Sequence, residues 1–137
     1  MSFLLDTNVI SELRKGSRTN AGVRDWFDGI SVEDVHLSVV VIGELRQGIE
    51  RVRKRDARSA GNLERWLDVL VEDYGARILP VDLAVAALWG RLNVPDPLPA
   101  IDGFLAATAL VHDLTLVTRD VRGVKSTGVA TLNPFKP

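Results

Sequence analysis

The chain has 137 residues, 46% of them hydrophobic, which is the length of one domain that buries roughly two-thirds of its unfolded surface. We therefore expect a single domain over residues 1–137. The absence of cysteine excludes disulfides and thiolate metal sites, and with only two histidines any bound metal ion would be held mainly by oxygen. The formal net charge of -1 argues against a surface that binds nucleic acid indiscriminately.

The sequence shows no pattern typical of a membrane-spanning segment or of a secretory leader. The amino terminus has no basic stretch before its short apolar run, and that run meets Asp6 at once. No apolar segment approaches the roughly 18 to 20 residues needed to span a bilayer. We expect a cytoplasmic protein that does not bind membranes.

The predicted elements alternate between strands and helices. In the first half, the expected strands cover residues 3–5 and 35–39, with helical spacing of apolar residues at 23–30, 42–52 and 63–71. In the second half, we expect strands at 77–81, 114–118 and 129–132, helices at 83–92 and 104–110, and a proline-rich loop at 93–99. This alternation predicts an α/β fold whose central parallel sheet is covered by helices on both faces.

Basic residues gather in one segment of the chain. Residues 46–65 contain seven arginines and lysines against three acids. The pattern is compatible with a basic face and equally with an ordinary solvated helix surface.

Acidic residues stand near the ends of sequence-distant elements. Asp6 follows the first strand directly, and Glu44 lies early in the helix after the second strand. Asp102 opens the helix after the proline-rich loop, and Asp120 follows the strand at 114–118. Ligands of parallel α/β sheets bind beyond the carboxyl ends of the strands, so these four side chains can converge on one pocket.

A pocket of carboxylates without intervening bases implies a bound cation, because the carboxylates otherwise repel one another. Ligation by oxygen alone selects Mg²⁺ or Mn²⁺. Such an ion lowers the pKa of a bound water and offsets charge on a phosphodiester, which makes hydrolysis possible without a side-chain nucleophile. The sequence has no Gly-x-Ser-x-Gly, Gly-x-Gly-x-x-Gly or Walker-type loop, which argues against acyl transfer, dinucleotide chemistry and P-loop nucleotide hydrolysis.

Each of these acids also has an ordinary structural interpretation. A single aspartate after a strand is more often a turn former or a helix cap than a ligand. Glu44 alone would more often be a solvated helix residue, but the apolar run at 39–42 predicts that it emerges from a buried strand end. Thr7, Asn8 and Thr118 are either hydrogen-bond partners that orient the carboxylates or local turn residues.

Four motifs occur in order from one end of the chain to the other. They are Asp6-Thr7-Asn8-Val9-Ile10-Ser11-Glu12-Leu13, Gly43-Glu44-Leu45-Arg46-Gln47-Gly48-Ile49, Leu98-Pro99-Ala100-Ile101-Asp102 with Ala106-Ala107-Thr108-Ala109, and Leu116-Val117-Thr118-Arg119-Asp120 with Leu132-Asn133-Pro134. Through these motifs the sequence resembles the PIN-domain ribonucleases that act as VapC-type toxins of type II toxin–antitoxin systems. Each motif alone is weak, but four in this order and at these distances are specific.

The resemblance implies a three-layer α/β/α fold, an acidic pocket for Mg²⁺ or Mn²⁺, and endonucleolytic cleavage of RNA. Asp6, Glu44 and Asp102 match the best-defined metal-site acids of the family. The family commonly has Thr-Arg-Asn, two residues and then an aspartate, whereas this chain has Asp120 at the asparagine position and Gly123 at the aspartate position. Either Asp120 takes over a ligand role or the second metal position is weakened.

The resemblance also implies a homodimer and a VapB-like antitoxin, which is a small DNA-binding protein whose tail blocks the toxin pocket. An acidic pocket that admits a polyanion needs basic residues around it. Arg46, Arg119 and Arg122 lie beside the motifs and are the candidates for contacts with RNA phosphates.

One alternative function remains open, and two further classes do not fit the arrangement of the acids. A catalytically degenerate PIN-like module would bind RNA or protein without cutting, and Gly123 is the reason to consider it. A phosphoacceptor receiver domain or a haloacid-type phosphatase also has acids at strand ends, but both arrangements need a second acid close to Asp6 that this chain lacks.

Overall fold

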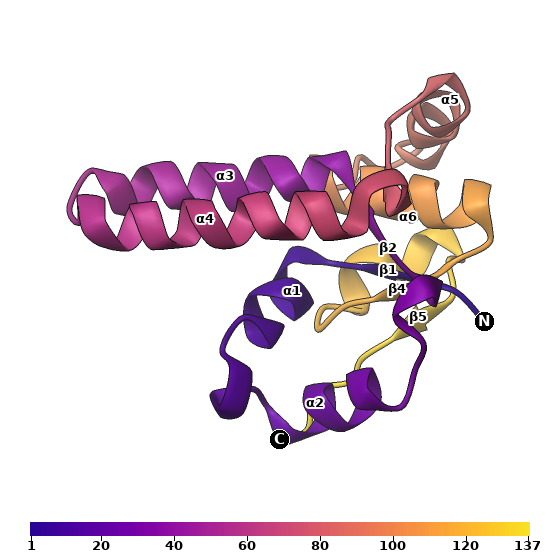
Figure 1. The fold of residues 1–137 in the computed structure, drawn as a ribbon. Helices are drawn as coiled ribbons and strands as arrows, with labels where there is room; N and C mark the ends of the chain where they lie inside the picture. The colour runs from indigo at the N-terminus through magenta and orange to yellow at the C-terminus, as the bar shows by residue number, and fades with distance from the viewer.

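The computed structural model describes residues 1–137 and contains one sheet of five strands (Figure 1). The strands are β1 (Phe3–Leu5), β2 (Val35–Ser38), β3 (Ile78–Leu79), β4 (Thr115–Val117) and β5 (Thr131–Leu132). They lie in the order β3-β2-β1-β4-β5, and every pair is parallel. All strands therefore end at the same edge of the sheet, which is where ligands of parallel sheets bind.

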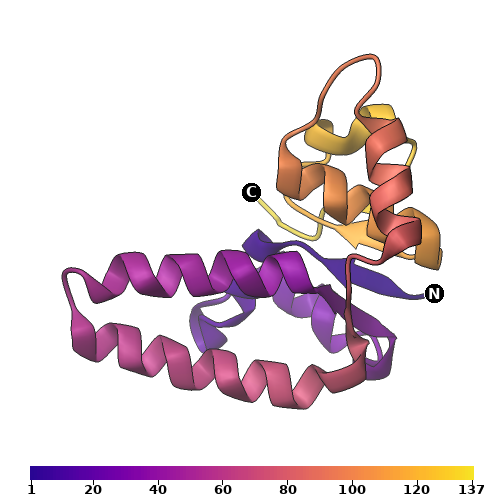
Figure 2. The ribbon, with the colours of Figure 1, turned by 90° about the horizontal axis from the view of Figure 1, so that it is seen from above.

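Six α-helices surround the sheet. They are α1 (Thr7–Leu13), α2 (Ala21–Asp28), α3 (Val39–Arg53), α4 (Ala57–Tyr74), α5 (Leu83–Leu92) and α6 (Ala100–His112). Short 3-10 helices complete the chain: η1 (Gly16–Arg18), η2 (Val32–Asp34), η3 (Gly75–Arg77) and η4 (Arg122–Thr127). Figure 2 shows α3 and α4 on one side of the strands and α5 with α6 on the other. The expected three-layer α/β/α fold with a central parallel sheet is confirmed.

The core lies between the central strands and the helices that cover them. Leu4 of β1, Leu37 of β2 and Leu116 of β4 are completely or almost completely buried. Leu105 and Ala106 of α6 are also fully buried. The small side chains of α6 allow this helix to lie close to the sheet, which fixes the position of its first turn.

The structure corrects the expected boundary after β2. The apolar run at 39–42 forms the beginning of α3 and not the end of a strand, because the Ser38 hydroxyl accepts a hydrogen bond from the Val40 amide (3.2 Å) and caps the helix. Glu44 therefore lies in the second turn of α3. It does not emerge from a buried strand end.

Smaller corrections concern other elements. Val71 of α4 is exposed and does not belong to the inner stripe of its helix. β5 begins at Thr131, because the chain before it turns at Gly128 with a φ of +74°. α6 begins at Ala100, directly after Pro99, since the fixed φ of proline suits the start of a helix. The helix expected at 83–92 and the edge position of the third strand are confirmed.

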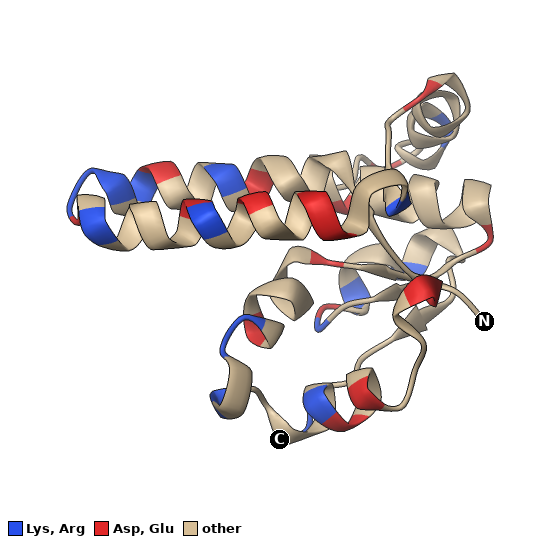
Figure 3. Cartoon of the chain, in the orientation of Figure 1, with Lys and Arg blue, Asp and Glu red and all other residues tan.

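Helices α3 and α4 form a long antiparallel hairpin whose turn lies far from the sheet (Figures 1 and 2). The Asp56 side chain begins α4 by accepting a hydrogen bond from the Ser59 amide (3.1 Å). Basic residues concentrate near this turn (Figure 3). No helix of the structure has both the length and the apolar character that a membrane crossing requires.

Candidate functional site

The topology brings the four acids of the sequence motifs to the carboxyl edge of the sheet. Asp6 follows β1, and Asp120 lies three residues beyond the end of β4, the neighbouring strand. Glu44 reaches the same region from α3, and Asp102 reaches it from the first turn of α6. Residues that are up to 114 positions apart in sequence thus share one region of the surface.

Asp6 is held by several hydrogen bonds. Its Oδ1 accepts from the Thr7 amide (2.7 Å), which also caps α1. Its Oδ2 accepts hydrogen bonds from the Thr118 hydroxyl (2.8 Å) and from the side-chain Nδ2 of Asn8 (3.4 Å). Because Thr118 is only 1% exposed, its hydroxyl is an immobile partner that fixes the Asp6 carboxylate.

The same polar side chains connect the other strand ends. Asn8 Oδ1 accepts a hydrogen bond from the Arg119 amide (3.2 Å), and Thr118 Oγ1 accepts one from the Asp120 amide (3.1 Å). The Thr7 hydroxyl donates to a carboxylate oxygen of Glu44. Thr7, Asn8 and Thr118 therefore link α1, α3 and the segment after β4.

Asp102 and Asp120 face each other across Gly123. A Cβ atom at position 123 would lie 3.0 Å from an oxygen of Asp102 and 3.0 Å from an oxygen of Asp120. The Gly123 amide donates to the other oxygen of Asp120 (3.3 Å). The glycine thus leaves open the space between two carboxylates, and any larger residue would have to displace one of them.

The charges of the four acids act on one another. The pKa of Asp102 is raised above its ordinary value, first by burial and then by the negative charges of Asp6, Asp120 and Glu44. None of the four carboxylates forms an ion pair with lysine, arginine or histidine. Their mutual repulsion is therefore not relieved by any basic side chain of the protein.

This arrangement suits a divalent cation in charge and in donor type. The carboxylates supply only oxygen ligands, which Mg²⁺ and Mn²⁺ prefer, and the space beside Gly123 is bounded by two of them. No three acidic or histidine side chains already converge on a single point, however. A complete coordination shell would require small side-chain movements or water ligands, and Mg²⁺ commonly keeps several waters.

The three candidate phosphate-binding arginines have different surroundings. Arg46 points into an ion-pair cluster of the α3–α4 hairpin, where it lies 2.6 Å from Glu64 and 3.7 Å from Glu50. The Arg119 guanidinium lies over the Phe135 ring, 4.8 Å from its centroid. Arg122 is exposed, has no ion-pair partner and is the neighbour of Gly123.

A hollow begins at Glu44 and runs along α3. It is lined by Thr7, Glu44 and residues of α3 and α4, and it also includes Arg14 from the end of α1. Arg14 was not among the site residues expected from the sequence. The signal was its spacing, because Thr7, Ser11 and Arg14 stand at i, i+4 and i+7 and so share one face of the helix.

The chain is similar to known proteins over almost its whole length. A family model described as PIN domain matches residues 3–128. The toxin FitB of Neisseria gonorrhoeae is 36% identical and the alignment covers 96% of this chain and 97% of FitB. VapC ribonuclease Y4jK of Sinorhizobium fredii is 32% identical over 98% of each chain.

Solved structures agree with the sequence comparisons. The crystal structure of FitAcB from Neisseria gonorrhoeae superposes with a TM-score of 0.87 at 36% identity, over 96% of this chain and 97% of the other. The acids at the carboxyl edge of the parallel sheet lie within the matched residues. The family match over residues 3–128 establishes that this chain belongs to the PIN-domain family.

Proposed function

We propose that the protein is the ribonuclease toxin of a toxin–antitoxin pair, and that it hydrolyses RNA with a divalent cation held by clustered carboxylates. The observation that carries the proposal is the set of four acids, Asp6, Glu44, Asp102 and Asp120, which influence one another and lack any basic partner. The relatives named as a VapC ribonuclease and as a toxin support the assignment.

We assign the metal ligands to the four carboxylates. Asp6 and Asp102 are the first candidates, because Asp6 is rigidly oriented by Thr118 and Asp102 has the raised pKa of a carboxyl among like charges. Glu44 and Asp120 complete the set from opposite sides. When bound, Mg²⁺ or Mn²⁺ supplies the Lewis acidity that activates water and offsets negative charge on the phosphodiester.

The remaining polar residues keep the carboxylates in position. Thr118 and Asn8 orient Asp6, and Thr7 holds Glu44 through its hydroxyl. Arg122 and Arg119 stand on the segment after β4 and are placed to contact phosphates of the bound RNA. Arg46 is the weakest candidate for such a contact, because its charge is already balanced by Glu64 and Glu50.

The proposed partners are a VapB-like antitoxin and a second copy of the chain. Two similar structures, with 36% and 33% identity, are those of FitAcB and of FitAB bound to a DNA fragment, in which FitB occurs together with a second component. A homodimer is supported by the exposed apolar residues near α5, since Leu83 is 86% exposed and Val94 is 74% exposed. Sedimentation of the purified chain would test whether it forms a dimer. The proposed RNA substrate fits action in the cytoplasm.

The experiment that tests the proposal is RNA cleavage by the purified protein without antitoxin. A structured RNA is incubated with Mg²⁺, with Mn²⁺ and with EDTA, beside the variants Asp6→Asn and Asp120→Asn. We expect cleavage only with a divalent cation and a loss of at least about 100-fold in Asp6→Asn, because removal of one ligand displaces the reacting groups. The Asp120→Asn result decides whether Asp120 takes the fourth ligand position.

A second candidate function is a degenerate PIN-like module that binds RNA or protein without cutting. The glycine at position 123 favours it, because an aspartate is common there in the family. A folded protein that binds Mg²⁺ but cuts no RNA under any of these conditions would support this second candidate. Metal-dependent cleavage would exclude it.

A further inference from the structure

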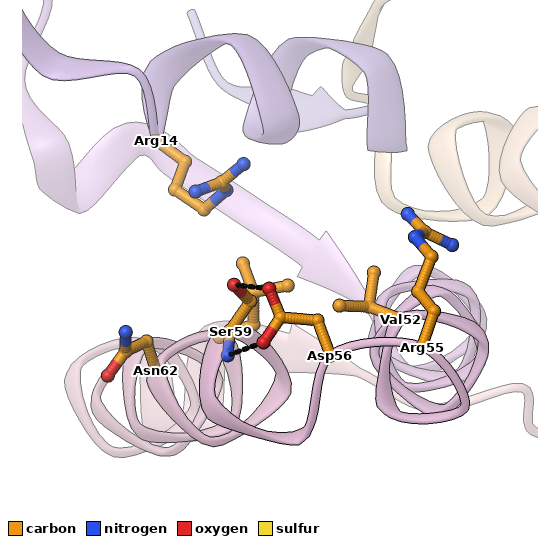
Figure 4. A pocket seen from close by; sticks show the side chains of 7 residues that line it. Arg14, Val52, Arg55, Asp56, Ser59 and Asn62 are labelled. Atoms are coloured by element: carbon orange, nitrogen blue, oxygen red, sulfur yellow. Dashed lines mark hydrogen bonds between the residues drawn. The ribbon is translucent and has the colours of Figure 1, made fainter.

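The largest hollow of the surface lies away from the four acids, between the end of α1 and the turn of the α3–α4 hairpin. Its lining includes Arg14, Arg55, Asp56, Ser59 and Asn62 (Figure 4). Figure 4 shows the guanidinium groups of Arg14 and Arg55 at the rim, with the Asp56–Ser59 pair between them in this view. The lining is mostly polar and carries two arginines.

This hollow adjoins the one that begins at Glu44. Both are lined by Arg14, Val52 and Leu63, and we describe the two neighbouring hollows together as one groove. We call it the hairpin groove. Its axis follows α3 from Glu44 to the hairpin turn, a distance of about 15 Å at the rise of an α-helix.

The arginines of the hairpin groove are available to a ligand. Neither Arg14 nor Arg55 forms an ion pair with an acidic side chain. The one carboxylate of the hollow, Asp56, has its oxygens occupied by the Ser59 amide (3.1 Å) and hydroxyl (2.6 Å). The groove therefore combines two arginines that form no ion pair, the carboxylate of Asp56, which is already satisfied within its own helix, and Glu44 of the candidate metal site at its other end.

One aromatic side chain lines the groove. Trp66 is half-buried, lines the groove near Glu44, and has the Arg14 guanidinium 5.9 Å from its ring centroid. Basic side chains that alternate with an aromatic ring are characteristic of surfaces that bind single-stranded nucleic acid, because arginines neutralise phosphates and a ring accepts a stacked base.

We propose that the hairpin groove holds the single-stranded RNA segment next to the cleaved phosphodiester. In this arrangement Arg14 and Arg55 are positioning residues that bind phosphates on one side of the acids, and Trp66 lies beside a base. The inference rests on the proposed ribonuclease function and adds the path of the substrate. It explains how a chain with a net charge of -1 brings a polyanion to an acidic pocket, because Arg14 and Arg55 supply positive charge along the groove that no acidic side chain pairs.

The test measures RNA binding in the Asp6→Asn background, which prevents cleavage. The probe is a fluorescein-labelled single-stranded RNA of roughly 12 nucleotides, within the site size of single-strand-binding folds, and the readout is fluorescence anisotropy over a range of salt concentrations. The variants are Arg14→Ala, Arg55→Ala and the double variant. Arg51→Ala is the matched control, because Arg51 is exposed, lies on the same hairpin and lines neither hollow.

We expect each single variant to weaken binding by about five- to tenfold at low salt and the double variant to lower the slope of log K against log salt by about 1.4, since each lost phosphate contact removes about 0.7 from the slope for a single strand. Arg51→Ala should leave this slope unchanged. Arg14→Lys should keep the slope of the parent, which separates a loss of charge from a loss of folding.

Two results would overturn the proposal. If Arg14→Ala and Arg55→Ala match Arg51→Ala while the wild type still cuts RNA with Mg²⁺, the nuclease stands and the hairpin groove is not the path of its substrate. The groove would then be a candidate docking surface for a protein partner. If the wild type neither binds nor cuts any RNA, both the groove assignment and the proposed function fail.

Discussion

The Thr118 hydroxyl donates a 2.8 Å hydrogen bond to Oδ2 of Asp6, and the same hydroxyl oxygen accepts a 3.1 Å hydrogen bond from the backbone amide of Asp120. One buried side chain at the end of β4 thus sets the orientation of an acid after β1 and of an acid after β4. The two neighbouring strands of the sheet center are coupled at their carboxyl ends through this single oxygen.

Replacing Thr118 by Val should therefore reduce activity more than stability. Valine has the same shape but offers no hydrogen bond, so Asp6 loses its immobile partner and RNA cleavage should fall about 10- to 100-fold, as for other residues that orient metal ligands. The free energy of unfolding should fall by only about 1 kcal/mol. Steady-state cleavage and urea unfolding measure both, and Thr118→Ser should retain most of the activity because it keeps the hydroxyl.

Adding one methyl group at Gly123 should disturb the space between two acids. In Gly123→Ala the new Cβ would stand 3.0 Å from oxygens of both Asp102 and Asp120, so at least one carboxylate must move by a few tenths of an ångström. We expect cleavage to fall by about tenfold, given that a misplacement of 1 Å can cost 100-fold. Gly90→Ala is the control, because a Cβ at position 90 of α5 contacts nothing within 4 Å. Equal activity of the two variants would show that the space beside Gly123 is not used.

The raised pKa of Asp102 predicts how stability depends on pH. The folded protein binds a proton at Asp102 more tightly than the unfolded chain does, so the contribution of this group to stability is full below the unfolded pKa and is lost as pH rises through the raised folded pKa. Without a divalent cation at neutral pH, Asp102→Asn should therefore melt at a higher temperature than wild type. The gain should be at most about 4 °C, because the carboxyl is partly solvated and its negative charge also interacts favourably with the amino end of α6.

The difference between the two proteins should disappear at about pH 3, where the wild-type carboxyl is protonated. Thermal unfolding with and without EDTA checks the prediction, and Mg²⁺ should raise the melting temperature of wild type more than that of Asp102→Asn. Asp68→Asn serves as the control, since Asp68 is an exposed residue of α4 without an ion pair. If Asp102→Asn melted at a lower temperature than wild type at neutral pH, this would contradict the claim that the Asp102 carboxylate is repelled by the neighbouring acids.

The arginines beside the site should differ in their effect on substrate binding. Arg122→Ala should raise KM for RNA about three- to tenfold with little change in kcat, because a phosphate contact worth roughly 1 kcal/mol is lost from ground state and transition state alike. Arg46→Ala should change KM less, since Arg46 is already bound to Glu64 at 2.6 Å. The comparison requires steady-state kinetics at two salt concentrations, and a larger effect of Arg46→Ala would reverse the ranking of the two residues.

The sequence placed Asp6 and Asp120 correctly in the fold, just beyond the ends of β1 and β4. Asp6 and Asp120 follow short β-branched or apolar runs that can only be buried strands in an alternating chain, and parallel pairing then requires that they meet at one edge. Local signals were also sufficient for α5, where Asp82 accepts a hydrogen bond from the Val85 amide (3.0 Å). These features depend on residues that are close in sequence.

Features that depend on contacts between residues far apart in the sequence could not be predicted from the sequence alone. The balance of Arg46 by Glu64 follows from the antiparallel packing of α3 and α4, and the linking role of Thr118 requires β1 and β4 to be neighbours. Arg14 lines the groove because α1 packs beside α3; helical spacing puts Arg14 on the same face as Thr7, but only this packing shows that the face borders the groove. The boundary before α3 was misplaced since the capping strength of Ser38 outweighed the β-propensity of the valines after it.

The order of the strands has a consequence for synthesis on the ribosome. β1 is the first strand made, yet it lies in the center of the sheet and needs β4, which begins at residue 115, as its partner on one side. The proposed site also needs Asp120, which is translated after the first 119 residues. A nascent chain that has not reached residue 120 lacks both the central pairing and one carboxylate, so neither the sheet nor the proposed site can be complete before that point of synthesis.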